Sequence, residues 1–449
     1  MRELLHDTAE RAARYLERLD DRPVFPSSSA VAGLAALDEP LPEKPCEPAA
    51  TLRLLDEVAG PATVASAGGR YFGFVTGGTQ PAALAASWLA AAWDQNAAFT
   101  VMSPAAARLE EIALGWLAEL LGLPTGCAGA LVSGATLANV TALAAARHAL
   151  LLRQGWDVER DGLFGAPPLS VVVGDEVHVS VLKALGLLGL GRERVLRVPV
   201  DAQGRLRANA LPPLSDSTIV CLQAGNVNTG AFDPAREVIA AARAAGAWVH
   251  VDGAFGLWAA ASPAYAQLAD GLGDADSWAT DTHKYLNVPY DSGAVFCRHP
   301  EQLRGAMMVG AAYLQTADQR EAAHYGPEFS RRARGVEVWA ALRTLGRAGV
   351  AELVERTCRH ARRFAAALRD AGHSVHNEVV LNQVLVSFGD ADRTRKVVTA
   401  LQAEGTCWAG ATTWQGHAAM RISVSSWATS DADVERSIAA MLRVARGAL

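Results

Sequence analysis

Apolar residues recur at helical spacing near the amino terminus and then give way to a proline-rich stretch. Residues 2–19 place leucines and alanines on one face, which predicts an amphipathic helix. Residues 20–60 contain six prolines and show no regular period until about Leu52, so we expect an extended arm there. A long, partly apolar arm is typical of a segment that packs on a partner subunit.

Short apolar runs alternate with helical segments from residue 103 onward. Ser103-Pro104 predicts the start of a helix that extends to Leu121, because serine caps helices and proline suits their first turn. The expected strands are 129–133, 169–173, 194–198, 218–223, 248–252, 276–280 and 292–297, and the expected helices among them are 136–153, 178–187 and 234–245. This alternation predicts an α/β domain with a mostly parallel seven-stranded sheet, which binds ligands at the carboxyl ends of its strands.

The last part of the chain predicts a second, smaller α/β domain. A long helical region covers 331–371. Beyond it, the expected strands 381–388 and 419–424 alternate with the expected helices 391–404 and 430–447. We therefore divide the chain into an amino-terminal helix and dimer-wrapping arm (1–68), a large domain (69–345) and a small carboxyl-terminal domain (346–449).

The composition excludes several classes of protein. Half of the residues are hydrophobic, a fifth are charged and the net charge is −6, without a basic block, which argues against nucleic-acid binding. Charges near Met1 do not suit a signal peptide, and apolar stretches such as 80–93 are too short to span a bilayer. The six cysteines are scattered, so we expect neither a disulfide framework nor a metal site, and a cytoplasmic location.

Lysine is rare in this chain, and one lysine occupies a conspicuous position. Four of the 41 Lys and Arg residues are lysines: Lys44, Lys183, Lys284 and Lys396. Arginine can replace lysine as a surface charge but not as an amine nucleophile, because guanidinium does not deprotonate and cannot form an imine. Lys284 follows the expected strand 276–280. A lysine at a strand end can be purely structural, held in an ion pair. The scarcity of lysine in this chain favours a chemical role instead.

Three further motifs follow expected strands, and each has a plain structural alternative. The segment Ser133-Gly134-Ala135-Thr136 leads from a strand into a helix, where free N–H groups and hydroxyls form an anion cup, although an ordinary helix cap has the same pattern. Asp252 ends a strand and Ala254 would let a flat ring approach the backbone, but a turn-capping aspartate fits equally well. His178 could stack on a ring or transfer a proton, whereas a single histidine is more often structural.

Together these residues match the needs of pyridoxal 5′-phosphate (PLP). Its phosphate requires N–H and hydroxyl donors, its ring nitrogen requires a carboxylate, and its aldehyde requires a lysine. From about Arg70 the chain resembles the fold-type I, PLP-dependent group II amino-acid decarboxylases, the class of the aromatic-L-amino-acid and glutamate decarboxylases. The motifs that carry the resemblance include Ser103-Pro104, Trp116-Leu117, Ser133-Gly-Ala-Thr136 with Asn139, His178, Gly230-Ala-Phe-Asp233, His250-Val-Asp252-Gly-Ala254, His283-Lys284, Asn287-Val-Pro-Tyr-Asp291, Arg331-Arg332 with Arg334, Trp339 with Arg343, and Arg421-Ile-Ser423.

The resemblance implies an aspartate-aminotransferase-like large domain and a role for each motif residue. Lys284 matches the Schiff-base lysine, Asp252 the acid on the ring nitrogen, and His178 the histidine that stacks on the ring. The positions that match phosphate-binding or other cofactor contacts are Ser133, Gly134, Ala135, Thr136, Gln223, Asn226, Ala254, Asp281 and His283. Tyr325 is expected to protonate the substrate Cα from a mobile loop that precedes the Arg-rich helix.

The resemblance also implies decarboxylation of an L-amino acid by a homodimer with its site at the subunit interface. The aromatic stretch 71–79 has no arginine beyond Arg70, which favours an aromatic or bulky apolar substrate. A decarboxylating aldehyde synthase, another carbon–carbon lyase, an aminotransferase and a non-catalytic member are the alternatives. The chain departs from the family pattern at Leu137, Asp281 and Glu337; an acid at 281 would repel phosphate unless it turned away.

Overall fold

The computed structural model describes residues 1–309 and 320–447, and the chain forms two compact units. The large unit comprises residues 79–359 and 377–383, and the small unit comprises 1–78, 360–376 and 384–449. The amino-terminal segment therefore groups with the carboxyl-terminal sheet, whereas the sequence predicted a separate part ending at residue 68. The predicted boundary at 345/346 falls at a kink in α11 (Arg334–Asp370), where Gly346 has a φ of 61°.

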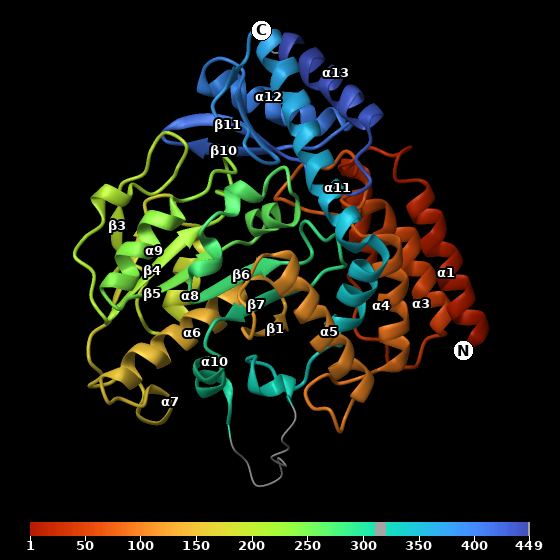
Figure 1. Cartoon of the computed structure of the whole chain (residues 1–449). Coiled ribbons are helices and arrows are strands. Elements are labelled where there is room, and N and C mark those ends of the chain that lie inside the picture. Colours follow the sequence, from red (N-terminus) through yellow and green to blue (C-terminus); the bar gives the residue numbers. More distant parts are fainter. Residues whose placement is uncertain (310–319, 448–449) are drawn as a thin grey trace. The chain divides into compact units, whose positions relative to one another are not determined.

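A seven-stranded sheet forms the centre of the large unit (Figure 1). Its strands are β1 (Ala128–Val132), β2 (Ser170–Gly174), β3 (Leu196–Val198), β4 (Thr218–Gln223), β5 (Trp248–Asp252), β6 (Ser277–Asp281) and β7 (Gly293–Cys297). They lie in the order β1-β7-β6-β5-β4-β2-β3, and only the pairs that involve β7 are antiparallel. The mostly parallel sheet predicted from the sequence is confirmed, with each strand within two residues of its expected limits.

Helices bury the hydrophobic side chains of this sheet. The helices of the large unit include α4 (Pro81–Trp93), α5 (Pro104–Leu120), α6 (Ala135–Arg153), α7 (Val158–Asp161), α8 (Val179–Leu187), α9 (Ala235–Ala244) and α10 (Pro300–Met307). Helix α6 packs against β5, β6 and β7, and its apolar residues form a core with α8, β2 and β4. Among the described residues, α6 alone is long and apolar enough to cross a membrane, but 72% of its apolar window is buried within the fold. Its hydrophobicity therefore reflects core packing.

The small unit contains a second sheet, with the strand order β10-β11-β9-β8. Its elements are β8 (Ser374–Val375), β9 (Gln383–Ser387), α12 (Ala391–Glu404), β10 (Gly410–Trp414), β11 (His417–Ser423) and α13 (Asp431–Gly447). Strands β8 and β10 were not expected from the sequence. Strand β10 has alternately half-buried and exposed residues over most of its length, so it lacks the continuous apolar run by which the buried strands were recognised.

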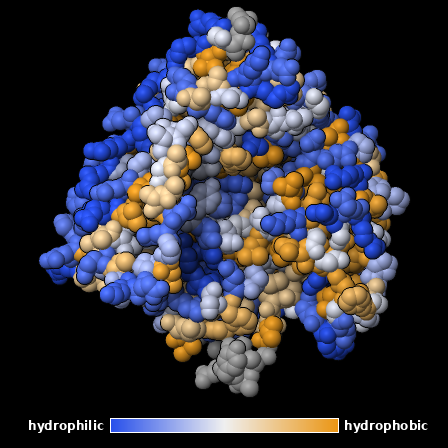
Figure 2. All heavy atoms as spheres, turned by 180° about the vertical axis from the view of Figure 1, so that it is seen from behind, coloured by the Kyte–Doolittle hydropathy of each residue, from blue (hydrophilic) through white to orange (hydrophobic). Residues whose placement is uncertain are grey.

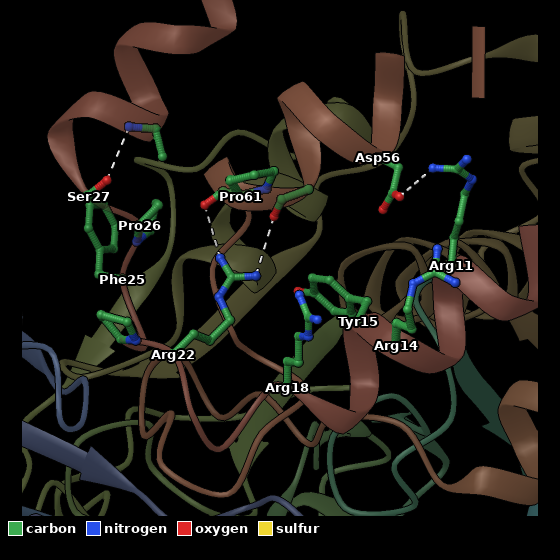
Figure 3. Close-up of a pocket in the computed structure, with 13 residues that line it drawn as sticks. Arg11, Arg14, Tyr15, Arg18, Arg22, Phe25, Pro26, Ser27, Asp56 and Pro61 are labelled. Carbon is green, nitrogen blue, oxygen red and sulfur yellow. Dashed lines mark hydrogen bonds and ion pairs between the residues drawn. The ribbon is translucent and has the colours of Figure 1, made fainter. Parts of the chain in front are cut away.

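The amino-terminal segment is more helical than its prolines suggested. Helix α1 (Arg2–Glu17) is followed by the short helices α2 (Ser28–Gly33) and α3 (Pro48–Leu54). Arg11, Arg14, Arg18 and Arg22 line a cavity of about 460 Å³ together with Tyr15 (Figure 3). Two of these arginines are held by the protein itself, because Arg11 pairs with Asp56 and Arg22 donates to backbone carbonyls of residues 60–63.

Several large hydrophobic side chains reach the surface. Trp88, Leu89 and Trp93 of α4 are about half exposed, and Val101 in the following loop is almost fully exposed. Hydrophobic residues also interrupt the hydrophilic surface on the face shown in Figure 2.

Candidate active site

The carboxyl ends of five strands meet at one edge of the large sheet. Strands β1 and β6 both run antiparallel to β7, so they run parallel to each other. Strands β5, β4 and β2 continue in the same direction. Because residues that follow parallel strands gather at one edge, the segments after these strands bring together Ser133, His178, Asp252 and Lys284.

The turn between β1 and α6 forms a narrow anion cup. Ser133 is half-buried and Thr136 is exposed at the start of α6. Between them, the backbone N–H of Ala135 donates to the Oδ1 atom of Asp281 over 2.5 Å. A Cβ atom on Gly134 would lie only 3.2 Å from Asp281 Oδ1 and from His283 Cε1, so glycine keeps the cup open at this position.

Asp281 links this cup to the rare lysine. Its Oδ2 atom lies 2.8 Å from Lys284 Nζ, while its Oδ1 atom lies 3.5 Å from His283 Nε2. The acid is buried and does not turn away from the helix start, although the sequence suggested that it would have to. Asp281 therefore already accepts the Ala135 N–H that an incoming phosphate would use.

His283 is fixed beside the cup by its neighbours. Its Nδ1 atom accepts the N–H of Ser292 over 3.2 Å, and its ring lies 4.3 Å from that of Tyr290. Burial lowers the pKa of His283, and the nearby Lys284 ammonium acts in the same direction while Asp281 opposes both. The neutral ring is thus favoured near pH 7 and can donate from Nε2 toward an anion.

Asp252 ends β5 as a buried carboxylate with three donors. Its Oδ2 atom accepts hydrogen bonds from Asn139 Nδ2 at 3.2 Å and from Ser180 Oγ at 3.3 Å. Its Oδ1 atom accepts the N–H of Ala254 at 3.3 Å. Hydrogen bonds of this kind stabilise the negative charge of a carboxylate in a buried place.

His178 caps the start of α8 and is tied to the same carboxylate. Its Nδ1 atom accepts the backbone N–H of Ser180 at 3.2 Å and lies 2.7 Å from Ser180 Oγ. Ser180 Oγ also bonds to Asp252, so one hydroxyl joins His178 and Asp252. Ala254, two residues after Asp252, is half-buried, and its small side chain would let a flat ring approach the backbone.

Helix α6 connects the two halves of the site. Ala135 at its first position faces Asp281, and Asn139 one turn later donates to Asp252. Four residues of helix correspond to about 6 Å. The anion cup and the buried carboxylate therefore both contact the first five residues of α6.

Gln223 and Asn226 hold the loops around the site. The Nε2 atom of Gln223 donates to the carbonyl of Glu176 at 2.8 Å, which supports the loop that carries His178. The Oδ1 atom of Asn226 accepts the N–H groups of Asn228 and Thr229 in its own turn. Its buried Nδ2 atom has no partner within the part of the chain that the structure describes.

Tyr325 is not brought to Lys284. Its ring lies 4.9 Å from the guanidinium carbon of Arg320 and lines a cavity of about 630 Å³ with Gly129 and Phe296. Gly129 belongs to the amino-terminal half of β1, so this cavity lies toward the sheet edge opposite Lys284. In this single chain the Tyr325 ring therefore packs on Arg320, and its predicted catalytic role is left to a test of turnover. Part of the loop in which that role was expected, residues 310–319, lies outside the described residues.

Asn139, Ser180 and His250 were not recognised from the sequence as part of the site. His250 was visible as a polar residue two positions before Asp252 in an apolar strand, and such residues share one face. Asn139 and Ser180 bond to Asp252, and His250 bonds to Asn139. These bonds depend on how α6 and α8 pack, which no local pattern reveals.

This set of side chains fits PLP. The ring nitrogen requires a buried carboxylate, the aldehyde requires an amine, and the phosphate requires N–H donors. Asp252, Lys284 and the first turn of α6 supply these groups at one sheet edge. The acid at position 281, which bonds to the Ala135 N–H, has a charge that opposes the phosphate.

Comparisons with known proteins agree with this fit. The family described as "Pyridoxal-dependent decarboxylase conserved domain" matches residues 45–389. An aromatic-L-amino-acid decarboxylase from Bacillus atrophaeus is 27% identical and aligns over 79% of this chain and 74% of that protein. Tryptophan decarboxylase 1 from Oryza sativa subsp. japonica is 28% identical over 95% of this chain and 90% of that protein.

Solved structures confirm the predicted fold class. The Oryza sativa TDC structure with PLP and tryptamine has a TM-score of 0.91 at 24% identity, covering 99% of this chain and 97% of that one. A Rhodiola rosea 4-hydroxyphenylacetaldehyde synthase has a TM-score of 0.85 at 21% identity, covering 100% and 98%. An L-2,4-diaminobutyrate decarboxylase from Rhizobium meliloti is 30% identical over 64% of this chain and 58% of that protein, so relatives differ in substrate. With the family match over most of its length and a Lys–Asp–His site at the sheet edge, this chain belongs to the pyridoxal-dependent decarboxylases, PLP enzymes that remove the carboxyl group of amino acids.

Proposed function

We propose that this decarboxylase acts on an aromatic or bulky apolar L-amino acid and releases the corresponding amine and carbon dioxide. The observation that carries the proposal is the buried Asp252 carboxylate, held by three donors at the sheet edge that also bears Lys284. A carboxylate in this position keeps a proton on the ring nitrogen of the cofactor, which is the condition for carbanion chemistry.

Four side chains and one backbone N–H of this chain would hold PLP and its protons. Bound PLP supplies an electron sink for the bond that breaks. Lys284 provides the amine that holds the aldehyde carbon until a substrate amine replaces it. Asp252 holds the ring-nitrogen proton, His178 covers the ring, and the Ala135 N–H with His283 binds the phosphate.

The preference for an apolar side chain rests on relatives and on one buried arginine. Relatives that align over most of this chain are named as aromatic-L-amino-acid and tryptophan decarboxylases. Arg70, the arginine next to the aromatic stretch 71–79, is buried and donates to the carbonyl of Asp20. One of its nitrogens is thus bonded within the small unit, while its Nε and Nη1 atoms are buried without a partner among the described residues.

A screen of L-amino acids with the PLP-loaded protein tests this proposal. Carbon dioxide and amine are measured together with aldehyde and hydrogen peroxide. We expect equal amounts of carbon dioxide and amine, with tryptophan, tyrosine or phenylalanine preferred over glutamate and aspartate. Aldehyde with peroxide would instead indicate an aldehyde synthase, and turnover limited to acidic or diamino substrates would contradict the substrate assignment.

Two lysine variants provide the matched control. Lys284→Ala should abolish turnover, because no other amine stands at this position. Lys183→Ala, which removes an exposed lysine five residues after His178, should leave turnover unchanged.

We further propose that the protein is a cytoplasmic homodimer that completes its site with the partner subunit. The half-exposed Trp88, Leu89 and Trp93 of α4 support an apolar interface, and four buried free cysteines suit a reducing compartment. Light scattering after size exclusion should give twice the mass of one chain. A monodisperse, active monomer would contradict the dimer.

A further inference from the structure

A run of buried hydrogen bonds reaches Asp252 from the interior of the large sheet. Trp248 Nε1 lies 3.0 Å from Ser277 Oγ, and Ser277 Oγ lies 3.0 Å from His250 Nδ1. His250 Nε2 lies 2.8 Å from Asn139 Oδ1, and Asn139 Nδ2 reaches both Ser180 Oγ and Asp252 Oδ2 at 3.2 Å. None of these residues is more than 6% exposed, so water does not compete for the bonds.

The chemistry of the groups fixes the direction of this run. The indole N–H of Trp248 can only donate to Ser277 Oγ, and the direction beyond this serine is set from the other end, because the Asp252 carboxylate accepts from Asn139 Nδ2 and leaves Asn139 Oδ1 to accept from His250 Nε2. Burial lowers the pKa of His250 to about 4, against a smaller opposing effect of Asp252, so its ring is neutral near pH 7. A neutral ring that accepts at Nδ1 donates from Nε2, here to Asn139 Oδ1.

The orientation of Asn139 follows from the same constraint. With Oδ1 facing His250, both Nδ2 hydrogens point to Asp252 and Ser180. The flipped amide would place oxygen 3.2 Å from the carboxylate oxygen of Asp252 and its nitrogen against the His250 N–H. Both contacts would be repulsive, so each donor in the run points toward Asp252.

Ser180 extends the network to the histidine of the site. Its Oγ atom accepts from Asn139 and has one proton to give, either to His178 Nδ1 at 2.7 Å or to Asp252 Oδ2 at 3.3 Å. A change in the charge of Asp252 therefore alters the partner of this hydroxyl. His178 and Asp252, the two groups that would contact the cofactor ring, are thus connected through Ser180, and Asn139 contacts both Ser180 and Asp252.

We propose that Asn139, held by His250, is a positioning residue that orients the Asp252 carboxylate toward the ring nitrogen of PLP, and that Ser180 couples this carboxylate to His178. The inference rests on the proposed PLP chemistry at Lys284. It adds three residues, Asn139, His250 and Ser180, that touch neither the phosphate nor the reacting carbon, and whose effect passes through Asp252.

Asn139→Asp tests the proposal because it keeps the shape of the side chain and replaces the two amide N–H donors with an acid that repels the Asp252 carboxylate or shares one proton with it. Loss of a hydrogen bond to a charged group corresponds to roughly tenfold or more in binding. We expect the PLP dissociation constant to rise by about that factor, kcat to fall more than KM changes, and the pH midpoint of the bound cofactor's visible absorbance to shift. Thr141→Val is the matched control, because Thr141 is buried in the same helix and its hydroxyl bonds only to the Leu137 carbonyl among the described residues.

A second variant covers the case in which Asn139→Asp does not fold, which thermal unfolding of the cofactor-free protein would reveal. Ser180→Ala removes one hydroxyl and should shift the absorbance midpoint in the same direction with a smaller loss of affinity. If the foldable variants match Thr141→Val within about twofold in affinity, absorbance midpoint and kcat, the positioning role is wrong while the decarboxylase assignment stands. A wild-type protein that neither binds PLP nor releases carbon dioxide would instead contradict the proposed function.

Discussion

Asp281→Asn should tighten the binding of PLP. In the structure the Asp281 carboxylate accepts the Ala135 N–H at 2.5 Å and pairs with Lys284 Nζ at 2.8 Å. A phosphate oxygen that accepted the same N–H would lie about 2.9 Å from that nitrogen, and hence within about 5.4 Å of Asp281 Oδ1. Two unit charges at this separation repel by roughly 3 kcal/mol at an effective dielectric constant of about 20.

The net gain should be smaller than this repulsion. The amide at position 281 also loses the ion pair with Lys284, and solvent screens part of the charge. We expect about 1.4 kcal/mol, or roughly tenfold tighter PLP binding, measured by fluorescence titration of the cofactor-free protein.

Pyridoxal without its phosphate provides the internal comparison. Its affinity should change little in Asp281→Asn, because the repulsion acts on the phosphate. Asp274→Asn neutralises a largely exposed aspartate shortly before β6, the strand that ends at Asp281. It should change the affinity for neither PLP nor pyridoxal. If Asp281→Asn weakened PLP binding, or tightened PLP and pyridoxal equally, Asp281 would act through Lys284 and the repulsion argument would be refuted.

Three further predictions concern His250, Arg331 and Tyr325. His250 has a pKa of about 4 when folded and 6.5 when unfolded, so the free energy of unfolding holds its full value above pH 6.5 and falls by about 3 kcal/mol as the pH drops toward 4. Urea unfolding across this pH range should show a shallower loss of that free energy for His250→Gln. An unchanged dependence on pH would refute the prediction. Arg331→Leu leaves the buried Glu110 without its closest partner and should lower the free energy of unfolding, measured by thermal unfolding, by about 3–5 kcal/mol. A decrease below about 1 kcal/mol would show that Arg320 compensates for the lost ion pair. Tyr325→Phe should leave turnover nearly unchanged, because the ring packs on Arg320; a loss of about 100-fold, the size of a general-acid contribution, would return Tyr325 to catalysis.

The fold could be predicted from the sequence because its signals are local. Buried parallel strands such as β4 and β5 read as continuous apolar runs, and Ser103-Pro104 marks a helix start. Strand β10 was missed because its half-buried pattern does not form an apolar run. The helices at 28–33 and 48–54 were missed because proline density suggested an irregular arm, although Pro48 suits a first helical turn.

The candidate site was predictable only where one residue type carries the chemistry. Lys284 and Asp252 stand out because an amine and a strand-end carboxylate have few substitutes in PLP chemistry. Asn139 and Ser180 carry no such signal, since their roles arise from bonds across 113 and 72 residues of sequence. Tyr325 is expected in catalysis because the family carries a tyrosine on the loop before the Arg-rich helix, and a place on a loop does not determine where a ring packs.

Reduction of the PLP-loaded protein with borohydride tests the central claim most directly. The reagent fixes any imine between PLP and a lysine, and peptide mass spectrometry then locates the added phosphopyridoxyl group. We predict the modification on the peptide that contains Lys284, and its loss in Lys284→Ala. Modification of Lys183 instead, or stable PLP binding without a reducible lysine adduct, would contradict the account.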